Sequence, residues 1–186
     1  MNRRTWLVAV VTIFLGWSPR PAAAQNGRRT IVILVRHAEK AAEPAADPPL
    51  TDVGKARAEA LWQAVKDAGV QAAITTQLVR TIETAAPTVA HLGIKSEIVA
   101  AGGADHPARV AAAIRKHAGE TVLVVGHSNT VPAIIAALGA KEPPPICDEA
   151  YDNLYVVTIN EAGKVSLIHS RYGVAPPAGS SCGAMK

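Results

Sequence analysis

The chain has 186 residues, of which 49% are hydrophobic and 18% are charged. This length is room for one domain of ordinary size and excludes a large multidomain protein. The balance of apolar and charged residues is typical of a folded globular protein and not of a disordered one. The formal net charge of +4 at pH 7 depends on an unusual N-terminal segment.

The first 24 residues resemble an export signal. Arg3 and Arg4 precede an apolar run over residues 6–16, and a small-residue stretch over residues 22–24 follows. This order predicts a signal peptide over residues 1–24, cleaved near Ala24. The apolar run is shorter than the roughly 20 residues that cross a bilayer, so we expect no stable membrane insertion after signal removal. We therefore expect a periplasmic or secreted protein, with a twin-arginine export route left open.

Removal of the signal takes away most of the positive charge. Arg3, Arg4 and Arg20 would be lost, which leaves 16 basic residues against 15 acidic ones. No concentrated basic stripe remains, and nucleic-acid binding needs one. We therefore expect no nucleic-acid partner, and the sequence predicts no particular oligomeric state.

Two cysteines, Cys147 and Cys182, fall in the part of the chain that would be exported. An oxidising compartment allows them to form a disulfide, and two free thiols are equally open, since the sequence gives no distance between them. Because Cys182 lies in a Gly/Ser/Pro-rich tail that we expect to be flexible, a bridge would tie this tail to the domain.

Strand patterns and helix patterns alternate along the rest of the chain. In chain order the sequence predicts a strand over 30–35, a helix over 50–68 capped by Thr51, a strand over 71–75, a helix over 78–91 with Pro87 inside it, a strand over 94–100, a helix over 107–118, a strand over 121–125, a helix over 131–138, and a closing pair of strands over 153–160 and 164–169. This alternation predicts an α/β fold, a three-layer sandwich whose largely parallel central sheet has helices on both faces. One domain over 25–186 is expected, with its core at about 30–170.

The first predicted helix shows an apolar stripe that should face the sheet. Its members are Val53, Ala56, Ala60, Leu61, Ala64, Val65 and Ala68. Gly69 is expected to end this helix.

Histidine and arginine side chains follow two of the predicted buried strands. Arg36 and His37 come after the first strand, His127 follows the fourth, and Arg80 lies early in the second helix. Ligands of parallel sheets bind at the carboxyl ends of the strands, so these four side chains are expected on one rim. Arginine forks suit a phosphate dianion. Nearby cations would keep an imidazole neutral, so that it could attack phosphorus.

Four motifs in this order carry a family resemblance. They are Arg36-His37, Leu50-Thr51-Asp52-Val53-Gly54, Arg80-Thr81-x-Glu83-Thr84-Ala85 and Gly126-His127-Ser128. Over residues 30–159 the chain resembles the histidine phosphatase (phosphoglycerate mutase-like) superfamily.

The resemblance implies a covalent phosphohistidine mechanism with His37 as the nucleophile. Arg36 and Arg80 would bind the phosphoryl group, and His127 would donate a hydrogen bond to its oxygens. No metal and no other cofactor is implied, because positioning and charge neutralisation can support phosphoryl transfer. We therefore expect an exported, metal-independent phosphatase that hydrolyses a small phosphomonoester.

The general acid and the reaction type leave alternatives. Mutase-like members typically have glycine where this chain has Ala38, and a glutamate acid in the loop after the third strand. In that loop we expect Asp105 to protonate the leaving oxygen, the alternative being a residue that caps the next helix. Glu83 is expected to do no more than pair with Arg80. A protein phosphohistidine phosphatase, a mutase of the same superfamily, and a non-catalytic module that binds phosphorylated ligands are the alternative functions.

Overall fold

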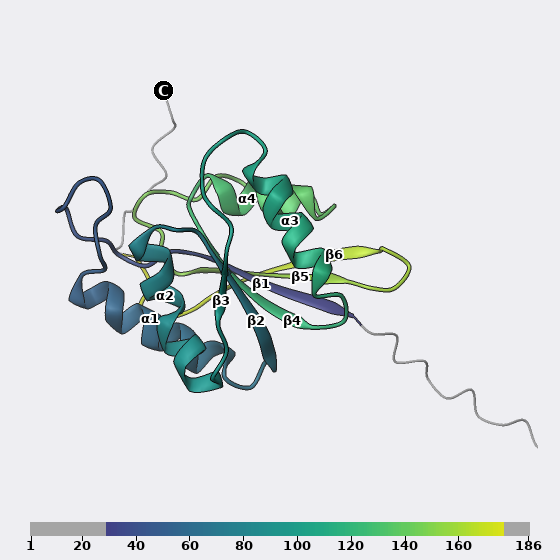
Figure 1. Cartoon of the computed structure of the whole chain (residues 1–186), viewed down its shortest axis with the longest axis horizontal. Helices are drawn as coiled ribbons and strands as arrows, with labels where there is room; N and C mark the ends of the chain where they lie inside the picture. The colour runs from purple at the N-terminus through teal and green to yellow at the C-terminus, as the bar shows by residue number, and fades with distance from the viewer. Residues whose placement is uncertain (1–28, 177–186) are drawn as a thin grey trace, which may run out of the picture.

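The computed structural model describes residues 29–176 (Figure 1). The elements are β1 (Thr30–Arg36), α1 (Asp52–Val65), β2 (Val70–Thr75), α2 (Val79–Leu92), β3 (Ser96–Ile98), α3 (His106–Lys116), β4 (Thr121–Gly126), α4 (Thr130–Ala137), β5 (Asn153–Ile159) and β6 (Val165–Arg171). Every predicted element is therefore present. The expected signal peptide, its cleavage site near Ala24 and the tail with Cys182 lie outside the described residues.

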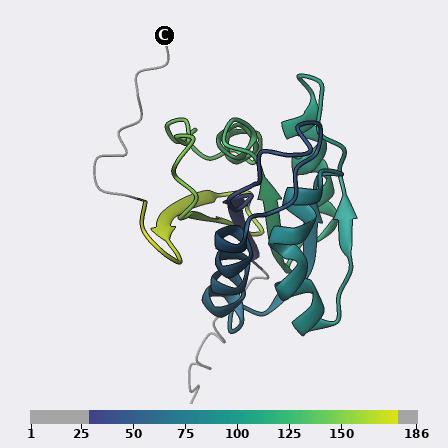
Figure 2. The same cartoon turned by 90° about the vertical axis from the view of Figure 1, so that its left-hand side faces the viewer.

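The six strands form one mixed sheet in the order β3-β2-β4-β1-β5-β6. Strands β1 to β4 pair in parallel, and β5 and β6 extend the sheet with antiparallel pairing. In Figure 2 the yellow β6 edge and the teal β3 edge lie on opposite sides of the molecule. The expected largely parallel sheet is confirmed.

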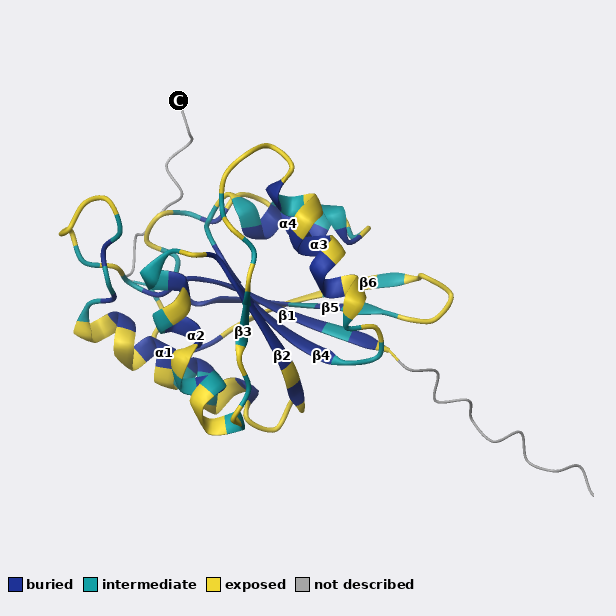
Figure 3. Ribbon diagram, viewed as in Figure 1, coloured by how far each residue is buried: buried dark blue, intermediate teal, exposed yellow. Residues whose placement is uncertain are grey.

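Apolar side chains cover both faces of this sheet. On one face Val110 and Ile114 of α3 and Ile134 of α4 pack against Val32 and other β residues. On the other face the apolar cluster joins α1, α2 and the sheet, and includes Leu61, Val65, Ala85, Ile33 and Val35. Strands β1 and β4, buried in the centre of the sheet (Figure 3), therefore lie between two helical layers. The predicted three-layer sandwich is confirmed.

Helix α1 buries a different face from the one predicted. Its buried residues are Gly54, Arg57, Ala58, Leu61 and Val65. Leu61 and Val65 confirm part of the expected stripe, whereas Val53 is 64% exposed and Ala56, Ala64 and Ala68 are exposed as well. The helix is turned so that Gly54 lies against the backbone of Glu39 and Arg57 forms an ion pair with the Glu39 carboxylate. A polar contact with the loop after β1 therefore decides which face of α1 is buried.

Strand β3 is shorter than the predicted segment over 94–100. It pairs over three residues with β2, at an edge of the sheet. The four helices are 8 to 14 residues long. None of the helices within residues 29–176 combines the length and the apolar character that crossing a bilayer requires.

We expect Gly54→Ala to destabilise the protein. A Cβ at this position would collide with the carbonyl oxygen of Glu39. Because the obstacle is backbone, α1 would have to shift, at roughly 1–3 kcal/mol for overpacking, which exceeds the ~1 kcal/mol that alanine gains over glycine in a helix. Urea unfolding followed by circular dichroism should show a lower midpoint.

The control for this experiment is Lys55→Ala, at an exposed position of the same helix turn. Its free energy of unfolding should stay within about 0.5 kcal/mol of the original. Equal midpoints for Gly54→Ala and Lys55→Ala would show that the close approach does not restrain α1.

Candidate active site

Four of the predicted site residues come together at the carboxyl ends of β1 and β4. Arg36 ends β1 and His37 follows it, while His127 follows the last residue of β4. The centroids of the two imidazole rings are 5.4 Å apart. Arg80, in the first turn of α2, is close enough to lower the pKa of both histidines. The expected rim of two histidines and two arginines is therefore present.

His37 is held as a neutral imidazole with one free nitrogen. Its backbone N–H donates to the carbonyl of Gly126 at 2.9 Å. Its Nδ1 lies 2.8 Å from the Ala38 carbonyl oxygen, which can only accept, so Nδ1 carries the proton. Burial lowers the pKa of His37 to about 3; the hydrogen bond to Ala38 opposes this shift and the charge of Arg36 adds to it. Nε2 therefore keeps a lone pair at neutral pH.

His127 faces a pair of threonine hydroxyls. Its Nε2 lies 3.3 Å from Thr76 Oγ1, which lies 2.9 Å from Thr81 Oγ1. Burial lowers the pKa of His127 to about 4, with further lowering by Arg80, His106 and Arg36. The sequence analysis did not identify Thr76. It directly follows β2, as His37 follows β1, and this position at a strand carboxyl end could have indicated it.

Arg36 is held by the loop over 147–151, which lies more than a hundred residues further along the chain. Its Nη1 donates to the carbonyls of Cys147 at 2.8 Å and Asp148 at 2.7 Å. The Tyr151 ring lies over the guanidinium, 4.2 Å from Cζ to the ring centroid, and 6.1 Å from the His37 ring. The loop over 147–151 therefore fixes the guanidinium plane, because a fork bound on one side has little freedom to rotate.

The sequence leaves open whether its cysteines form a disulfide or remain free thiols. Cys147, whose carbonyl binds Arg36, is disulfide-bonded. The second cysteine of the sequence, Cys182, lies outside the described residues.

Arg80 is positioned by the loop between β1 and α1. The Asp47 carboxylate accepts the backbone N–H of Val79 at 3.0 Å and lies 3.7 Å from Arg80 Nη1. Among the described residues, neither Arg80 Nε nor Arg36 Nε has a hydrogen-bond partner, although both are buried. A buried donor without a partner is unfavourable, so both N–H groups are available to an anion in the site.

The two acidic residues of the sequence analysis lie apart from the imidazoles. The Asp105 carboxylate is 69% exposed and pairs with Arg109 Nε at 3.0 Å. Asp105 does occupy the N-cap position of α3, as the alternative expected, but its side chain makes no capping hydrogen bond. Glu83 was expected to pair with Arg80, but it accepts the backbone N–H of Leu50 at 2.6 Å. That contact joins α2 to the segment just before α1.

His106, next to Asp105, was given no role by the sequence. It is 2% exposed, and its Nδ1 donates to the carbonyl of Ala100 at 3.0 Å. It is also close enough to lower the pKa of His127. The turn before α3 thus presents a buried imidazole towards the site, while the acid beside it faces solvent.

These features define a class of protein. A three-layer α/β sandwich with two histidines and two arginines at the carboxyl ends of its parallel strands is the phosphoglycerate mutase-like architecture. The profile of the histidine phosphatase superfamily (branch 1) matches residues 32–101. This match covers less than half of the 186 residues and agrees with the resemblance that the sequence motifs carry.

Solved structures share the fold over most of the described chain. The protein histidine phosphatase SixA, complexed with tungstate, has a TM-score of 0.59 and 19% identity, covering 76% of this chain and 96% of SixA. A mycobacterial glucosyl-3-phosphoglycerate phosphatase has a TM-score of 0.60 and 13% identity, covering 78% and 99%. Phosphoserine phosphatase from Entamoeba histolytica, in complex with 3-phosphoglyceric acid, has a TM-score of 0.57 and 15% identity, covering 78% and 98%. A search of curated proteins gave no significant match.

We expect acid to destabilise the protein through its two site histidines. The folded pKa values of His37 and His127, about 3 and about 4, lie below the ordinary value of about 6.5. The unfolded chain therefore binds protons first. The free energy of unfolding should fall as the pH drops below about 6.5, by on the order of 1 kcal/mol per pH unit for each histidine.

Urea unfolding between pH of about 7 and about 5 measures this dependence. The double variant His37→Asn/His127→Asn keeps the carboxylates and removes only these two groups, so its pH dependence should be flatter. An equally steep loss of stability in the double variant would place the effect elsewhere.

Proposed function

We propose that this chain is an exported, metal-independent phosphatase that hydrolyses a small phosphomonoester through a phosphohistidine on His37. One observation carries the proposal. A buried neutral imidazole, with its Nδ1 proton committed to Ala38, lies beside two arginines whose buried Nε–H groups have no partner among the described residues. This combination offers a nucleophile and an anion site in one place.

The reaction follows from these positions in two displacements. His37 Nε2 attacks phosphorus, a P–N bond forms, and the P–O bond to the leaving group breaks. The charge of the transferring group lies between Arg36 and Arg80, and His127 donates a hydrogen bond to it. Water then attacks the phosphorus atom of the phosphohistidine, and the P–N bond breaks. Inorganic phosphate is released, and the imidazole of His37 is regenerated.

Metal independence is supported by the chemistry of the site residues. The cations Arg36 and Arg80 can supply the charge neutralisation that Mg²⁺ supplies in other phosphoryl transfers. Export is supported by the sequence of residues 1–24 alone.

Asp105 remains our choice for the acid that protonates the leaving oxygen. Its support is its position at the N-terminus of α3, next to His106, which is close enough to lower the pKa of His127. To reach a leaving group, the Asp105 carboxylate has to exchange Arg109 for substrate, and both side chains are exposed enough to do so. Once released from Arg109, the Asp105 carboxyl group has to take up a proton from solvent, which it then donates to the leaving oxygen.

A second candidate is a phosphatase for phosphohistidine. It is favoured by the absence, within residues 29–176, of any carboxylate hydrogen-bonded to His37 or His127. A nitrogen leaving group departs more easily than an alkoxide, so it needs no dedicated acid. SixA, which shares the fold, is named as a protein histidine phosphatase.

We expect His37→Ala to abolish turnover of an aryl phosphate by the chain without its signal, with a loss of at least about 10³-fold. Rapid quenching with a ³²P donor in alkali should trap label on the original protein and none on the variant. His117→Ala is the control, because this histidine pairs with Glu120 away from the site. Normal turnover by a folded His37→Ala protein would refute the mechanism.

Asp105→Asn distinguishes the two candidate substrates. For an alkyl phosphate the loss of a general acid should lower kcat by about 10²–10⁴-fold, while phosphohistidine turnover should stay unchanged. Vanadate should inhibit both reactions and EDTA neither. Loss of activity with EDTA would indicate a metal enzyme, and tight phosphate binding without turnover of any substrate would indicate the non-catalytic module.

A further inference from the structure

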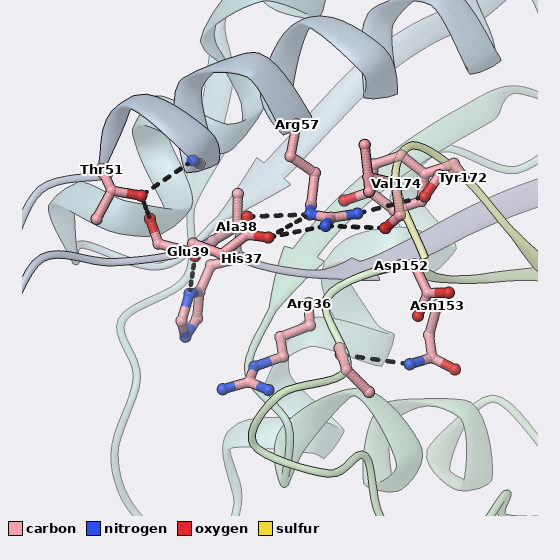
Figure 4. A network of polar contacts seen from close by, with 12 residues as sticks. Arg36, His37, Ala38, Glu39, Thr51, Arg57, Asp152, Asn153, Tyr172 and Val174 are labelled. Carbon is pink, nitrogen blue, oxygen red and sulfur yellow. Dashed lines mark hydrogen bonds and ion pairs between the residues drawn. The ribbon is translucent and has the colours of Figure 1, made fainter. Parts of the chain in front are cut away.

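A partly buried ion pair involves Glu39, which follows His37 by two residues in the chain; the two side chains of the pair are 7% and 20% exposed. Arg57 of α1 is 7% exposed, and its Nε and Nη2 bind the Glu39 carboxylate at 2.7–3.0 Å. Figure 4 shows the guanidinium reaching from the helix to Glu39 on one side and to the segment after β6 on the other. On that second side it donates to the carbonyls of Tyr172 at 3.4 Å and Val174 at 3.0 Å.

The backbone around Glu39 is fixed by further contacts. Its carbonyl accepts the backbone N–H of Thr51 at 2.9 Å, and Gly54 lies against the same group. One residue earlier, the N–H of Ala38 donates to Thr84 Oγ1 at 2.9 Å. The Ala38–Glu39 peptide is therefore held at both of its ends.

This peptide carries the atom that determines the tautomer of His37. The Ala38 carbonyl accepts the His37 Nδ1 proton at 2.8 Å. If that carbonyl turned away, Nδ1 would lose its acceptor and the proton could move to Nε2, which must be free for attack. We propose that Arg57 and Glu39 form a positioning pair, which holds the Ala38 carbonyl in place and so keeps His37 in its nucleophilic tautomer.

The geometry of the pair suits positioning better than stabilisation. A buried ion pair contributes little net stability, because desolvation of both charges opposes their attraction. A guanidinium that binds a carboxylate through two nitrogens fixes both distance and orientation, which an apolar contact does not. Arg57 uses its other donors on Tyr172 and Val174, so its own position is also restrained.

The test is the tautomer of His37, read by ¹⁵N NMR of its ring nitrogens in the chain without its signal. The original protein should show one neutral form, protonated at Nδ1. Arg57→Gln and Glu39→Gln should each show a mixture of the two neutral tautomers. Because the kinetic part rests on the proposed function, it is measured separately: kcat should fall about tenfold to hundredfold, as for a misplaced reacting group, with KM within about twofold.

Two further variants separate positioning from stability. Arg57→Lys restores one ion pair to Glu39 and should recover part of kcat and part of the single tautomer. Val65→Ala removes a buried side chain from the same helix without touching Glu39, so it should lower Tm while leaving the tautomer and kcat unchanged.

Each outcome decides the proposal. If Arg57→Gln lowers Tm as Val65→Ala does but keeps a single tautomer and normal kcat, the pair is structural and the proposal is overturned. If the original protein hydrolyses no phosphorylated compound but Arg57→Gln still mixes the tautomers, the proposed function fails and the positioning pair stands. If Arg57→Gln does not fold, Glu39→Gln and Arg57→Lys provide the same comparison.

Discussion

The parallel register of β1 with β4 is the constraint on which the site depends. Arg36 pairs with Gly126 in this register, so His37 and His127 each come one residue after a matched position, and the His37 N–H donates to Gly126. Both imidazoles therefore emerge at the same height, with ring centroids 5.4 Å apart. A slip of one residue would turn each β1 side chain towards the opposite helical layer and disrupt the packing of both apolar clusters, so the two layers favour the observed register.

This register brings two arginines and two histidines close together, and four positive charges there would repel one another. The imidazoles avoid this repulsion by staying neutral, as their lowered pKa values show. The arginines remain charged, and each is partly neutralised by a different loop: Arg36 by two carbonyls and the Tyr151 ring, and Arg80 by Asp47. Each loop leaves one buried Nε without a partner among the described residues. The loops thus balance the charge while leaving donors for an anion.

The sequence could predict the parts of this arrangement that depend on local pattern. Buried apolar runs define the strands, and the rule that ligands bind at strand carboxyl ends brings Arg36, His37 and His127 to one rim. The loop partners could not be predicted, because Arg36 and Cys147 are 111 residues apart in the chain and their contact depends on loop conformation. The stripe on α1 was misjudged at Val53 because periodicity counts apolar residues only. Apolar periodicity does not indicate that Arg57 is buried, because this burial depends on an ion pair with Glu39 in the loop after β1.

The two halves of the chain contribute different parts of the chemistry. The family profile covers residues 32–101, which hold His37, the proposed nucleophile, and both arginines. His127 and the loop over 147–151 lie beyond it, and the segment after β6 reaches back to Arg57. The second half therefore supplies the second imidazole, the restraint on Arg36 and two carbonyl partners of Arg57. Differences in substrate between proteins that share this fold are expected to arise from loops such as 41–49, which holds Asp47 against Arg80, and 141–149, which supplies carbonyl partners to Arg36.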